Sequence, residues 1–590
     1  MNAARTFWLL LDARERRGCF ALLALAAIMA LGTVAGIAAV MPFFAVLADP
    51  ALIGRHVALG WLHTHTGNLS TRSFLWLLGG GFVALLLASS AINLLGSAAM
   101  TRFAHRVGDQ VRIRLFDSYL ARDYPFHVRR GMAVLAGNVL HQADRVTGMV
   151  HAAAMVVSNL LTTALIFFSI AVVDAGMSML VLLLFGLAYL LMYAIARRRL
   201  LANGRLQTEL GAERVSVVHQ GLTGIKDVLL SQSRRTFSTR FARASREISR
   251  TAAHTQLVGL APRYLLECVS GVALVGAALA LSARAPRGAW LATLTFVGFS
   301  AYRLLPTLQQ LYFSLVTLRA GRSAFDSVVA DLGASPAVAL PESGEAALPR
   351  ECAAIELIDV GFRHAADGPR VLEHVSLRIA AGSVVAFTGA NGSGKTTTAD
   401  LLLGLLTPDS GRIEVDGVAL DAGMLEAWKR SLACVSQHVF LLDASVRENI
   451  TLGAAARDDE ARLHEAVRLA GARELIESLP GRYEQRLGDR GARLSGGQRQ
   501  LIGLARALYR RPSFLVLDEV DASLDADNTA RLATVLQGLR GLCTVVIITH
   551  HERLLEVCEG RFEFGAGLVR RIEVARGEQA LPVRRLRSTP

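Results

Sequence analysis

The sequence predicts a chain of two parts, an all-α polytopic membrane domain with six transmembrane helices followed by an α/β domain. Hydrophobic residues make up 52% of the 590 residues and charged residues only 19%, whereas soluble domains carry about 25% charged residues. Long apolar runs dominate up to about Thr317, and short β-like runs alternate with amphipathic helices from Ile355 onward. These observations exclude a disordered chain, a disulfide scaffold and a purely soluble enzyme.

Six apolar segments are long enough to cross a bilayer, which requires about 20 residues in a helix. They are Cys19–Leu47, Ser73–Met100, Val146–Val173, Met177–Ile195, Val258–Ser282 and Trp290–Leu318. We expect the membrane domain over residues 19–332. The basic, amphipathic stretch Thr6–Arg17 predicts an N-terminal interfacial helix over residues 1–18, because such a stretch favours the headgroup layer. The first apolar run is too long for a cleavable signal peptide.

Arginine-rich connections predict the orientation of these helices. The connections between segments two and three and between segments four and five are strongly basic, whereas the opposite loops carry only Arg55, Arg72, Arg284 and Arg287. Positive loops stay in the cytoplasm, so we expect the basic loops and both termini there. The basic loops are either soluble inserts or continuations of the helices that turn back through short transverse helices near Tyr124–Gly131 and Gly221–Leu229. The second interpretation is favoured, because structureless loops of that length are uncommon.

Composition also places the remaining boundaries. A segment rich in Pro, Gly, Ala and Glu, residues 333–349, is expected to link the two domains. The α/β domain is expected over residues 350–576, followed by a basic tail over residues 577–590 that is solvated or contacts anionic lipid. Since an excess of arginine can reflect coding composition alone, the net charge of +14 does not indicate nucleic-acid binding.

A glycine-rich motif follows an apolar strand at the start of the α/β domain. The strand Val384–Thr388 leads into GxxxxGK[ST], the pattern of a phosphate-binding P-loop. Backbone N–H groups of such a loop close around phosphates at a helix N-terminus. The expected nucleotide-binding residues are Gly389, Asn391, Gly392, Ser393, Gly394, Lys395, Thr396 and Thr397. Lys395 is expected to reach the β- and γ-phosphates of ATP, and Thr396 to place its hydroxyl on Mg²⁺.

Two carboxylates end a second apolar strand. The run Phe514–Leu517 is followed directly by Asp518 and Glu519. Buried strands rarely finish with two acids unless a metal or a reaction needs them. We expect Asp518 to hold Mg²⁺ and Glu519 to polarise the attacking water as a general base.

The motif that follows carries a family resemblance. Leu494–Gln498 reads LSGGQ, which resembles the signature of ATP-binding cassette (ABC) ATPases. In the same order, Gln437 is similar to the Q-loop glutamine that senses Mg²⁺ and water, and His550 to the switch histidine that bonds the γ-phosphate. Ser523, Leu524 and Asp525 resemble the D-loop. Six membrane helices before one α/β P-loop ABC ATPase domain resemble an exporter-type half-transporter. The resemblance implies Mg²⁺-dependent ATP hydrolysis coupled to transport across a bacterial inner membrane.

The resemblance also implies a second copy of the chain. In this family the signature completes the γ-phosphate site of another cassette, which assigns that role to Ser495 and Gly497. Gly496, Gln498 and Asp525 are further expected nucleotide-binding residues. Glu519 and His550 are both present, so a homodimer with two competent sites is the economical interpretation, and a heterodimer stays open. One position departs from the family pattern. His364 stands where an aromatic residue usually stacks on adenine, so His364 either stacks more weakly or is a surface residue while another side chain covers the base.

The substrate is predicted from one ionisable residue. Arg303 lies in the sixth segment, about 20 Å from Trp290 at 1.5 Å per residue, and a guanidinium there binds phosphate in a forked manner. Alternatively Arg303 pairs with a carboxylate such as Glu267 or snorkels to the interface. For Arg263 and Glu267, four residues apart, a simple ion pair is expected.

Segments around these residues are similar to PglK-type flippases, which implies a polyprenyl-pyrophosphate-linked oligosaccharide as substrate. The segments are Gly224–Val228, Ala261–Glu267 and Tyr302–Pro306. In that branch the first external loop can hold a short helix, and Leu52–Asn68 would occupy it here. The alternatives are a peptide or drug exporter, a lipid A-like flippase, and an ATP-gated channel or regulator. Preserved Glu519 argues against the channel, because a gate requires no hydrolytic base.

Overall fold

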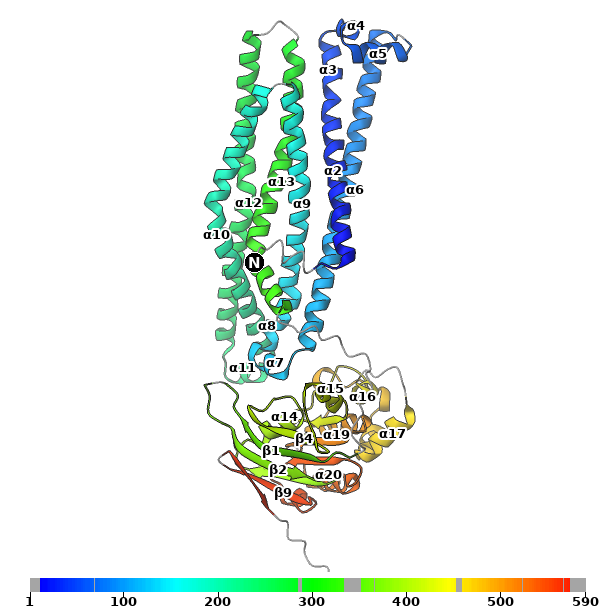
Figure 1. Ribbon diagram of the computed structural model, residues 1–590, viewed down its shortest axis with the longest axis vertical. Coiled ribbons are helices and arrows are strands. Elements are labelled where there is room, and N and C mark those ends of the chain that lie inside the picture. The colour runs from blue at the N-terminus through cyan, green and yellow to red at the C-terminus, as the bar shows by residue number, and fades with distance from the viewer. Residues whose placement is uncertain are drawn as a thin grey trace, which may run out of the picture. The chain divides into compact units, whose positions relative to one another are not determined.

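The computed structural model describes residues 11–67, 69–173, 175–284, 289–333, 352–365, 367–452, 459–522, 524–565 and 567–572. The expected basic tail, nearly all of the expected linker and the first ten residues of the expected interfacial helix lie outside these ranges. The chain forms two compact units, one built mainly from residues up to 340 and one mainly from residues after it. Figure 1 follows the elements of each unit in chain order.

The first unit is entirely helical in its described part. Its elements are α2 (Ala13–Ala38), α3 (Val40–Ala48), α4 (Leu52–Arg55), α5 (Val57–His65), α6 (Thr71–Leu120), α7 (Tyr124–Arg130), α8 (Met132–Gly137), the π-helix η1 (Asn138–Gln142), α9 (Ala143–Val173), α10 (Ala175–Thr223), α11 (Ile225–Leu230), α12 (Arg234–Arg284) and α13 (Ala289–Gly333).

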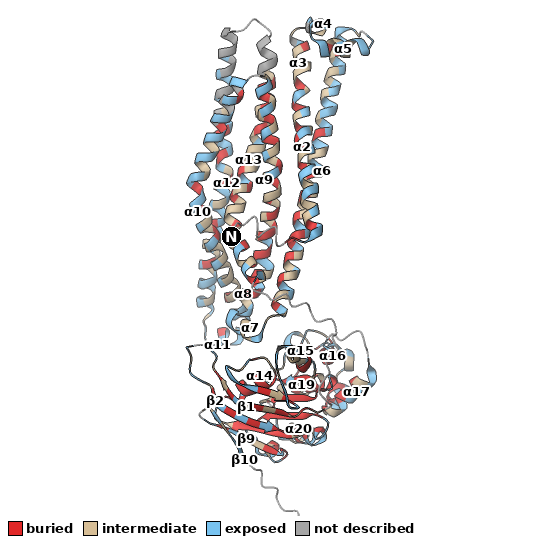
Figure 2. Ribbon diagram, viewed as in Figure 1, coloured by how far each residue is buried: buried red, intermediate tan, exposed pale blue. Residues whose placement is uncertain are grey.

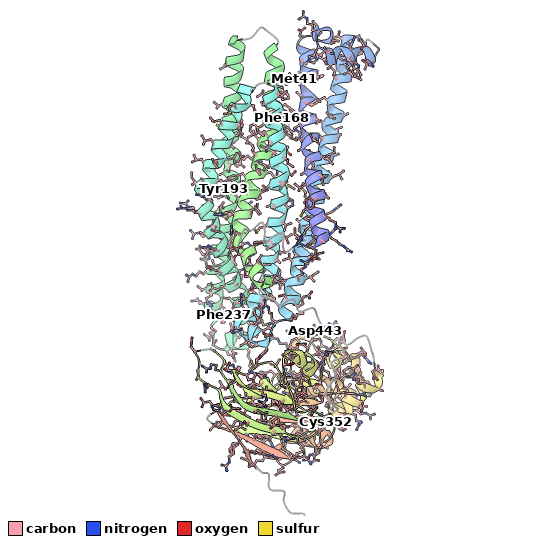
Figure 3. The ribbon with its side chains drawn as sticks, viewed as in Figure 1. Met41, Phe168, Tyr193, Phe237, Cys352 and Asp443 are labelled. Carbon is pink, nitrogen blue, oxygen red and sulfur yellow. The ribbon has the colours of Figure 1, made fainter. Side chains whose placement is uncertain are left out.

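Each of the six predicted apolar segments lies in this helical framework. The first is shared by α2 and α3, and the others fall within α6, α9, α10, α12 and α13. Within the described residues, Ala13–Leu47, Thr71–Leu120 and Met132–Val173 are long and apolar enough to span a membrane. Large apolar side chains project from these helices (Figure 3), and Phe168 on α9 is 67% exposed. Such exposure is expected where lipid, rather than water, surrounds a helix.

The long helices extend beyond any bilayer. Helix α6 has 50 residues and α12 has 51, which corresponds to about 75 Å at 1.5 Å per residue, more than twice the hydrocarbon thickness. The short helices α7 and α11 stand at the turns where the sequence predicts them. The interpretation of the basic loops as helix continuations is therefore confirmed, and the alternative of soluble inserts is wrong.

The loop between α3 and α6 forms the two short helices α4 and α5 rather than one. Leu59 on α5 is buried against Val46 of α3 and Phe74 of α6, with Ile53 and Leu62 packed around them. This small core explains why the segment is ordered.

A buried carboxylate fixes the end of α13. Asp331 Oδ2 accepts hydrogen bonds from the Tyr119 hydroxyl at 2.6 Å and from Asn138 Nδ2 at 3.0 Å. Asp331 Oδ1 lies 3.1 Å from Arg130 Nη2. The side chain is only 2% exposed. The last helix is thus tied to the end of α6, to α7 and to the π-helix by a single side chain.

The second unit contains two sheets and their helices. Its strands are β1 (Ile355–Phe362), β2 (Leu372–Ile379), β3 (Val384–Gly389), β4 (Ser410–Val415), β5 (Val418–Ala419), β6 (Leu432–Val435), β7 (Phe514–Asp518), β8 (Thr544–Ile548), β9 (Gly560–Gly565) and β10 (Leu568–Ile572). Its helices are α14 (Lys395–Leu402), α15 (Ala422–Arg430), α16 (Val446–Thr451), α17 (Glu460–Leu469), α18 (Arg473–Ser478), α19 (Gly496–Tyr509), α20 (Ala526–Leu539) and α21 (Glu552–Leu555), with 3₁₀ turns η2 (Arg482–Glu484) and η3 (Asp489–Gly491).

The larger sheet brings three loops to one edge. Its order is β10-β9-β3-β8-β7-β6, with β3 parallel to β8 and β8 parallel to β7. Ile548 at the end of β8 is paired with Phe387 of β3 and with Asp518 of β7. The buried residues of the second unit concentrate in these strands (Figure 2). Strands buried on both faces read as continuous apolar runs, as these do, and ligands bind beyond the carboxyl ends of such strands.

Candidate active site

The loop after β3 is shaped by glycines that no other residue could replace. Gly389 and Gly394 have φ of 134° and 102°. A Cβ on Gly389 would lie 2.2 Å from the carbonyl oxygen of Phe564, and one on Gly394 would lie 2.7 Å from Leu372. Positive φ is strained for any residue with a side chain. The loop therefore presents backbone to its interior, with Gly392 and Asn391 exposed at its tip.

Lys395 is folded over this loop. Its Nζ donates hydrogen bonds to the carbonyl oxygens of Gly389 at 2.6 Å and Ala390 at 2.9 Å. Burial lowers the pKa of the ammonium, while the charges of Glu519 and Asp518 act in the opposite direction. The two carbonyl dipoles compensate only part of the positive charge of the ammonium, so an anionic phosphate would be a stronger partner.

Two hydroxyls of the loop fit phosphate and magnesium. The Ser393 hydroxyl is buried and has no hydrogen-bond partner within the described residues. A buried polar atom without a partner is costly, so this oxygen fits a phosphate contact. Thr396, in the first turn of α14, is exposed and open to a metal ion.

The two carboxylates lie at the end of β7 as predicted. Burial raises the pKa of Asp518, and the neighbouring charge of Glu519 raises it further, whereas Lys395 lowers it. Glu519 leaves the strand with φ of 47°, and its backbone N–H donates to Ile548 O at 3.1 Å. This sparsely populated conformation is typical of functional positions. It turns the Glu519 side chain out of the strand.

Gln437 contacts the general-base candidate directly. Its Nε2 donates a hydrogen bond to Glu519 Oε2 at 2.9 Å. Its own carbonyl oxygen accepts a hydrogen bond from Gln500 Nε2 at 2.8 Å. The glutamine is therefore held between helix α19 and the carboxylate, and its side-chain oxygen remains for a metal ion.

Asp400 is a further acidic residue that sequence reasoning missed. It lies in α14, five residues after Lys395, and burial together with the charge of Asp518 raises the pKa of Asp400 to about 6. The charge of Asp518 thus acts on both Asp400 and Lys395. No group of three or more Asp, Glu, His or Cys side chains that could hold a metal ion occurs in the described residues. Mg²⁺ usually takes only one or two carboxylates from a protein, together with substrate phosphates, so the Asp518 carboxylate with the Thr396 hydroxyl and the Gln437 amide oxygen fits this ion.

His364 lies beside the P-loop helix. Its Nε2 is 3.4 Å from the Thr397 hydroxyl, and its ring packs edge-on against Phe362 with a centroid distance of 5.1 Å. The imidazole is exposed. His364 is therefore a surface residue beside the P-loop helix, and its stacking on adenine stays a prediction.

The signature residues form the start of α19. The Ser495 hydroxyl accepts a hydrogen bond from Gln498 N–H at 3.3 Å, and Gln498 Oε1 accepts one from Ser495 N–H at 2.9 Å. This reciprocal capping box fixes the first turn, with Gly496 and buried Gly497 inside it. No hydrogen bond joins Ser495 to the P-loop among the described residues.

Asp525 and His550 complete the placement of the predicted residues. Asp525 caps α20 by accepting from Asn528 N–H at 2.9 Å, which is a structural function that the sequence did not predict. His550 is exposed directly after β8, beside the buried Thr549. Ser523 lies outside the described residues.

Arg303 is not paired with the carboxylate that the sequence offered. Glu267 Oε1 accepts a 2.7 Å hydrogen bond from Arg263 Nε, so the expected pair of these two residues is confirmed. The Arg303 guanidinium carbon lies 5.8 Å from the centre of the Phe299 ring, and Arg303 makes no ion pair in the described part of the chain. The alternative of an Arg303–Glu267 pair is wrong, because Arg263 holds Glu267 from one helical turn away.

Comparison with known families and proteins agrees with this geometry. Residues 21–298 match the family model of the ABC transporter transmembrane region, and residues 372–522 match that of the ABC transporter. The class of protein that the fold and site define is thus a membrane-bound transport ATPase with both parts in one chain.

Named relatives refine this result. An ATP-dependent lipid A-core flippase of Alkalilimnicola ehrlichii is 30% identical over 79% of this chain and 78% of its own. A second, from Bordetella avium, is 28% identical over 91% and 90%. A solved structure titled as a bacterial Atm1-family ABC exporter with ATP bound shares the fold, with a TM-score of 0.76, 19% identity and 94% coverage of both chains. The chain belongs to the ABC transporter family, as an exporter-type half-transporter, and is a multi-pass membrane ATPase that couples ATP hydrolysis to transport.

These relatives correct the branch expected from sequence. Both relatives are named lipid A-core flippases, not PglK-type flippases. They support the lipid A-like alternative better than the PglK-type expectation.

Proposed function

We propose that a homodimer of this chain moves a phosphate-bearing, lipid A-like glycolipid across the bacterial inner membrane. The observation that carries the proposal is the likeness to lipid A-core flippases over most of the chain. Arg303 supports it, because a guanidinium that stacks on Phe299 without a carboxylate partner among the described residues keeps its N–H groups for phosphate oxygens.

The proposed hydrolytic mechanism follows from the site. The P-loop N–H groups, the Ser393 hydroxyl and Lys395 would hold the ATP phosphates. Thr396, Asp518 and Gln437 would hold Mg²⁺, which would neutralise phosphate charge. Glu519 accepts a proton from the attacking water, oriented by Gln437. His550 bonds the γ-phosphate. His364 covers the adenine.

A second copy supplies the signature in this proposal. Ser495, Gly496, Gly497 and Gln498 at the N-terminus of α19 meet the γ-phosphate of the partner's P-loop, where a helix N-terminus favours an anion. Asp525 lies at the same junction. ATP binding closes the two cassettes, and the short helices α7 and α11 transmit the motion to the membrane helices.

The test is flipping in reconstituted vesicles. Purified chain in proteoliposomes, supplied with MgATP, should translocate a fluorescent lipid A analogue and show ATPase stimulation by lipid A. A polyprenyl-pyrophosphate oligosaccharide and a hydrophobic peptide serve as competing cargoes. Translocation of either in place of lipid A would reject the proposed substrate, and ATP hydrolysis by a strictly single-copy particle at full rate would reject the dimer.

A further inference from the structure

A side-chain hydrogen bond joins the segment after β7 to the segment after β8. The Thr549 hydroxyl donates to Asp521 Oδ2 at 2.5 Å. The same hydroxyl oxygen accepts a hydrogen bond from His551 N–H at 3.0 Å. Thr549 is 1% exposed, so water cannot replace either contact. The bonds run from Asp521 through Thr549 to His551, and they fix the residues on both sides of His550.

The backbone ties the same two segments at a second point. Glu519 N–H donates to Ile548 O at 3.1 Å, and Ala522 N–H closes a turn onto Glu519 O at 3.2 Å. Asp521 lies in this turn, two residues after the general-base candidate. The carboxylate that orients Thr549 is therefore held by the same turn that holds Glu519.

We infer that Asp521 is a positioning residue for ATP hydrolysis, which sets His550 relative to Glu519 through the Thr549 hydroxyl. The inference rests on the functions proposed above for His550 and Glu519. A hydroxyl that donates to a carboxylate makes a short, directional bond. This bond fixes the hydroxyl rotor so that its lone pair faces His551 N–H. Without Asp521 the rotor is released, and the hydrogen-bonded link between the turn at Asp521 and the residues that flank His550 is lost.

The chain provides a matched control on the same strand. Thr544, at the opposite end of β8, is also buried, donates to Ala353 O at 2.7 Å and accepts from Gly382 N–H at 2.9 Å. Its hydroxyl has the same donor and acceptor pattern but no connection to Asp521. Thr544→Val should therefore lower the melting temperature and leave kcat unchanged.

The experiment compares full-length variants in lipid nanodiscs for kcat and KM with MgATP and for melting temperature. Asp521→Ala and Thr549→Val should each lower kcat about tenfold, as expected for one lost charge-assisted hydrogen bond, with KM changed less than about threefold. Asp521→Asn keeps the shape and should lose less, and Thr549→Ser should restore wild-type kcat. The double variant Asp521→Ala/Thr549→Val should fall no lower than Thr549→Val alone, because Thr549→Val already removes the bond to Asp521 together with the bond from His551 N–H.

Several results would overturn the inference. The inference fails if Asp521→Ala keeps the wild-type kcat. It also fails if the losses of the two single variants multiply in the double variant, or if Thr544→Val loses as much kcat as Thr549→Val. The proposed catalytic functions are tested separately with His550→Ala and Glu519→Gln. If those two variants keep turnover, the hydrolytic assignment fails. If they lose it while Asp521→Ala does not, only the inference about Asp521 fails.

Discussion

Gln437 Nε2 and Glu519 Oε2, 82 positions apart in the sequence, lie 2.9 Å apart at the end of β7. This bond holds one carboxylate oxygen and leaves the other for water. It also links the proposed base to the residue that would sense the metal ion, so in the proposed mechanism magnesium binding and water activation would share one side chain.

Glu519→Gln should bind MgATP and lose nearly all turnover. An amide cannot accept the proton, and a general base contributes about 10²- to 10⁴-fold to a rate. Steady-state ATPase rates and a nucleotide-binding titration of the same preparation measure both properties. ATPase activity near that of the wild type would refute the assignment of the base.

Lys395→Ala should abolish productive nucleotide binding, because it removes the buried ammonium that faces the loop. Lys429→Ala is the control, since Lys429 lies on α15 and pairs with Glu426 at 3.1 Å. Equilibrium binding of a fluorescent ATP analogue separates the two variants. Equal affinity in both would remove Lys395 from the site.

Arg303→Ala should stop transport of the phosphate-bearing lipid while basal ATPase persists, because the guanidinium lies on Phe299 in the first unit and not in the nucleotide site. Arg263→Ala removes an arginine that is already paired with Glu267 and should transport normally. Flipping in vesicles, normalised to ATPase, measures the difference. Unchanged flipping by Arg303→Ala would dismiss a headgroup contact.

The Asp400 carboxyl makes the free energy of unfolding depend on pH, and replacing Asp400 should remove this dependence. Its pKa is raised from 3.8 to about 6, so the folded chain binds this proton more tightly than the unfolded chain does. The stabilisation is complete below pH 3.8 and is lost as the pH rises through about 6. Asp400→Asn should therefore gain melting temperature over the wild type at pH 7.5, without nucleotide or magnesium, and gain none near pH 4. The same difference in melting temperature between Asp400→Asn and the wild type at both pH values would contradict this.

Asp331→Ala should destabilise the first unit by about 3 kcal/mol, because it breaks a buried ion pair with two further hydrogen bonds. Asp326→Ala on the same helix should cost less than about 1 kcal/mol, since its carboxylate is 60% exposed and pairs with Arg322 at 3.6 Å. Thermal melting in detergent compares them. A similar shift for both variants would show that the Asp331 contacts add no stability.

Sequence alone predicted the features that depend on local patterns. The apolar runs predicted the membrane helices, and the motif spacing predicted that Lys395, Asp518 and Gln437 would surround one site. Contacts between residues far apart, each unremarkable in its own segment, could not be predicted. Asp331 and Tyr119 are separated by 212 positions, and neither has a pattern that names the other. The bond from Thr549 to Asp521 could not be predicted either, because the two residues are 28 positions apart and no sequence pattern connects them.

The capping box does not use the hydrogen of the Ser495 hydroxyl as a donor. A hydroxyl can take one hydrogen bond and give another at the same time, and the oxygen of Ser495 already takes one from Gln498. Its hydrogen therefore remains available to an anion that approaches the N-terminus of α19, and the cap need not break when such an anion binds. Alanine at this position would remove the cap and the free hydroxyl hydrogen together, whereas threonine would keep both, so the hydroxyl group separates a silent exchange from a disabling one.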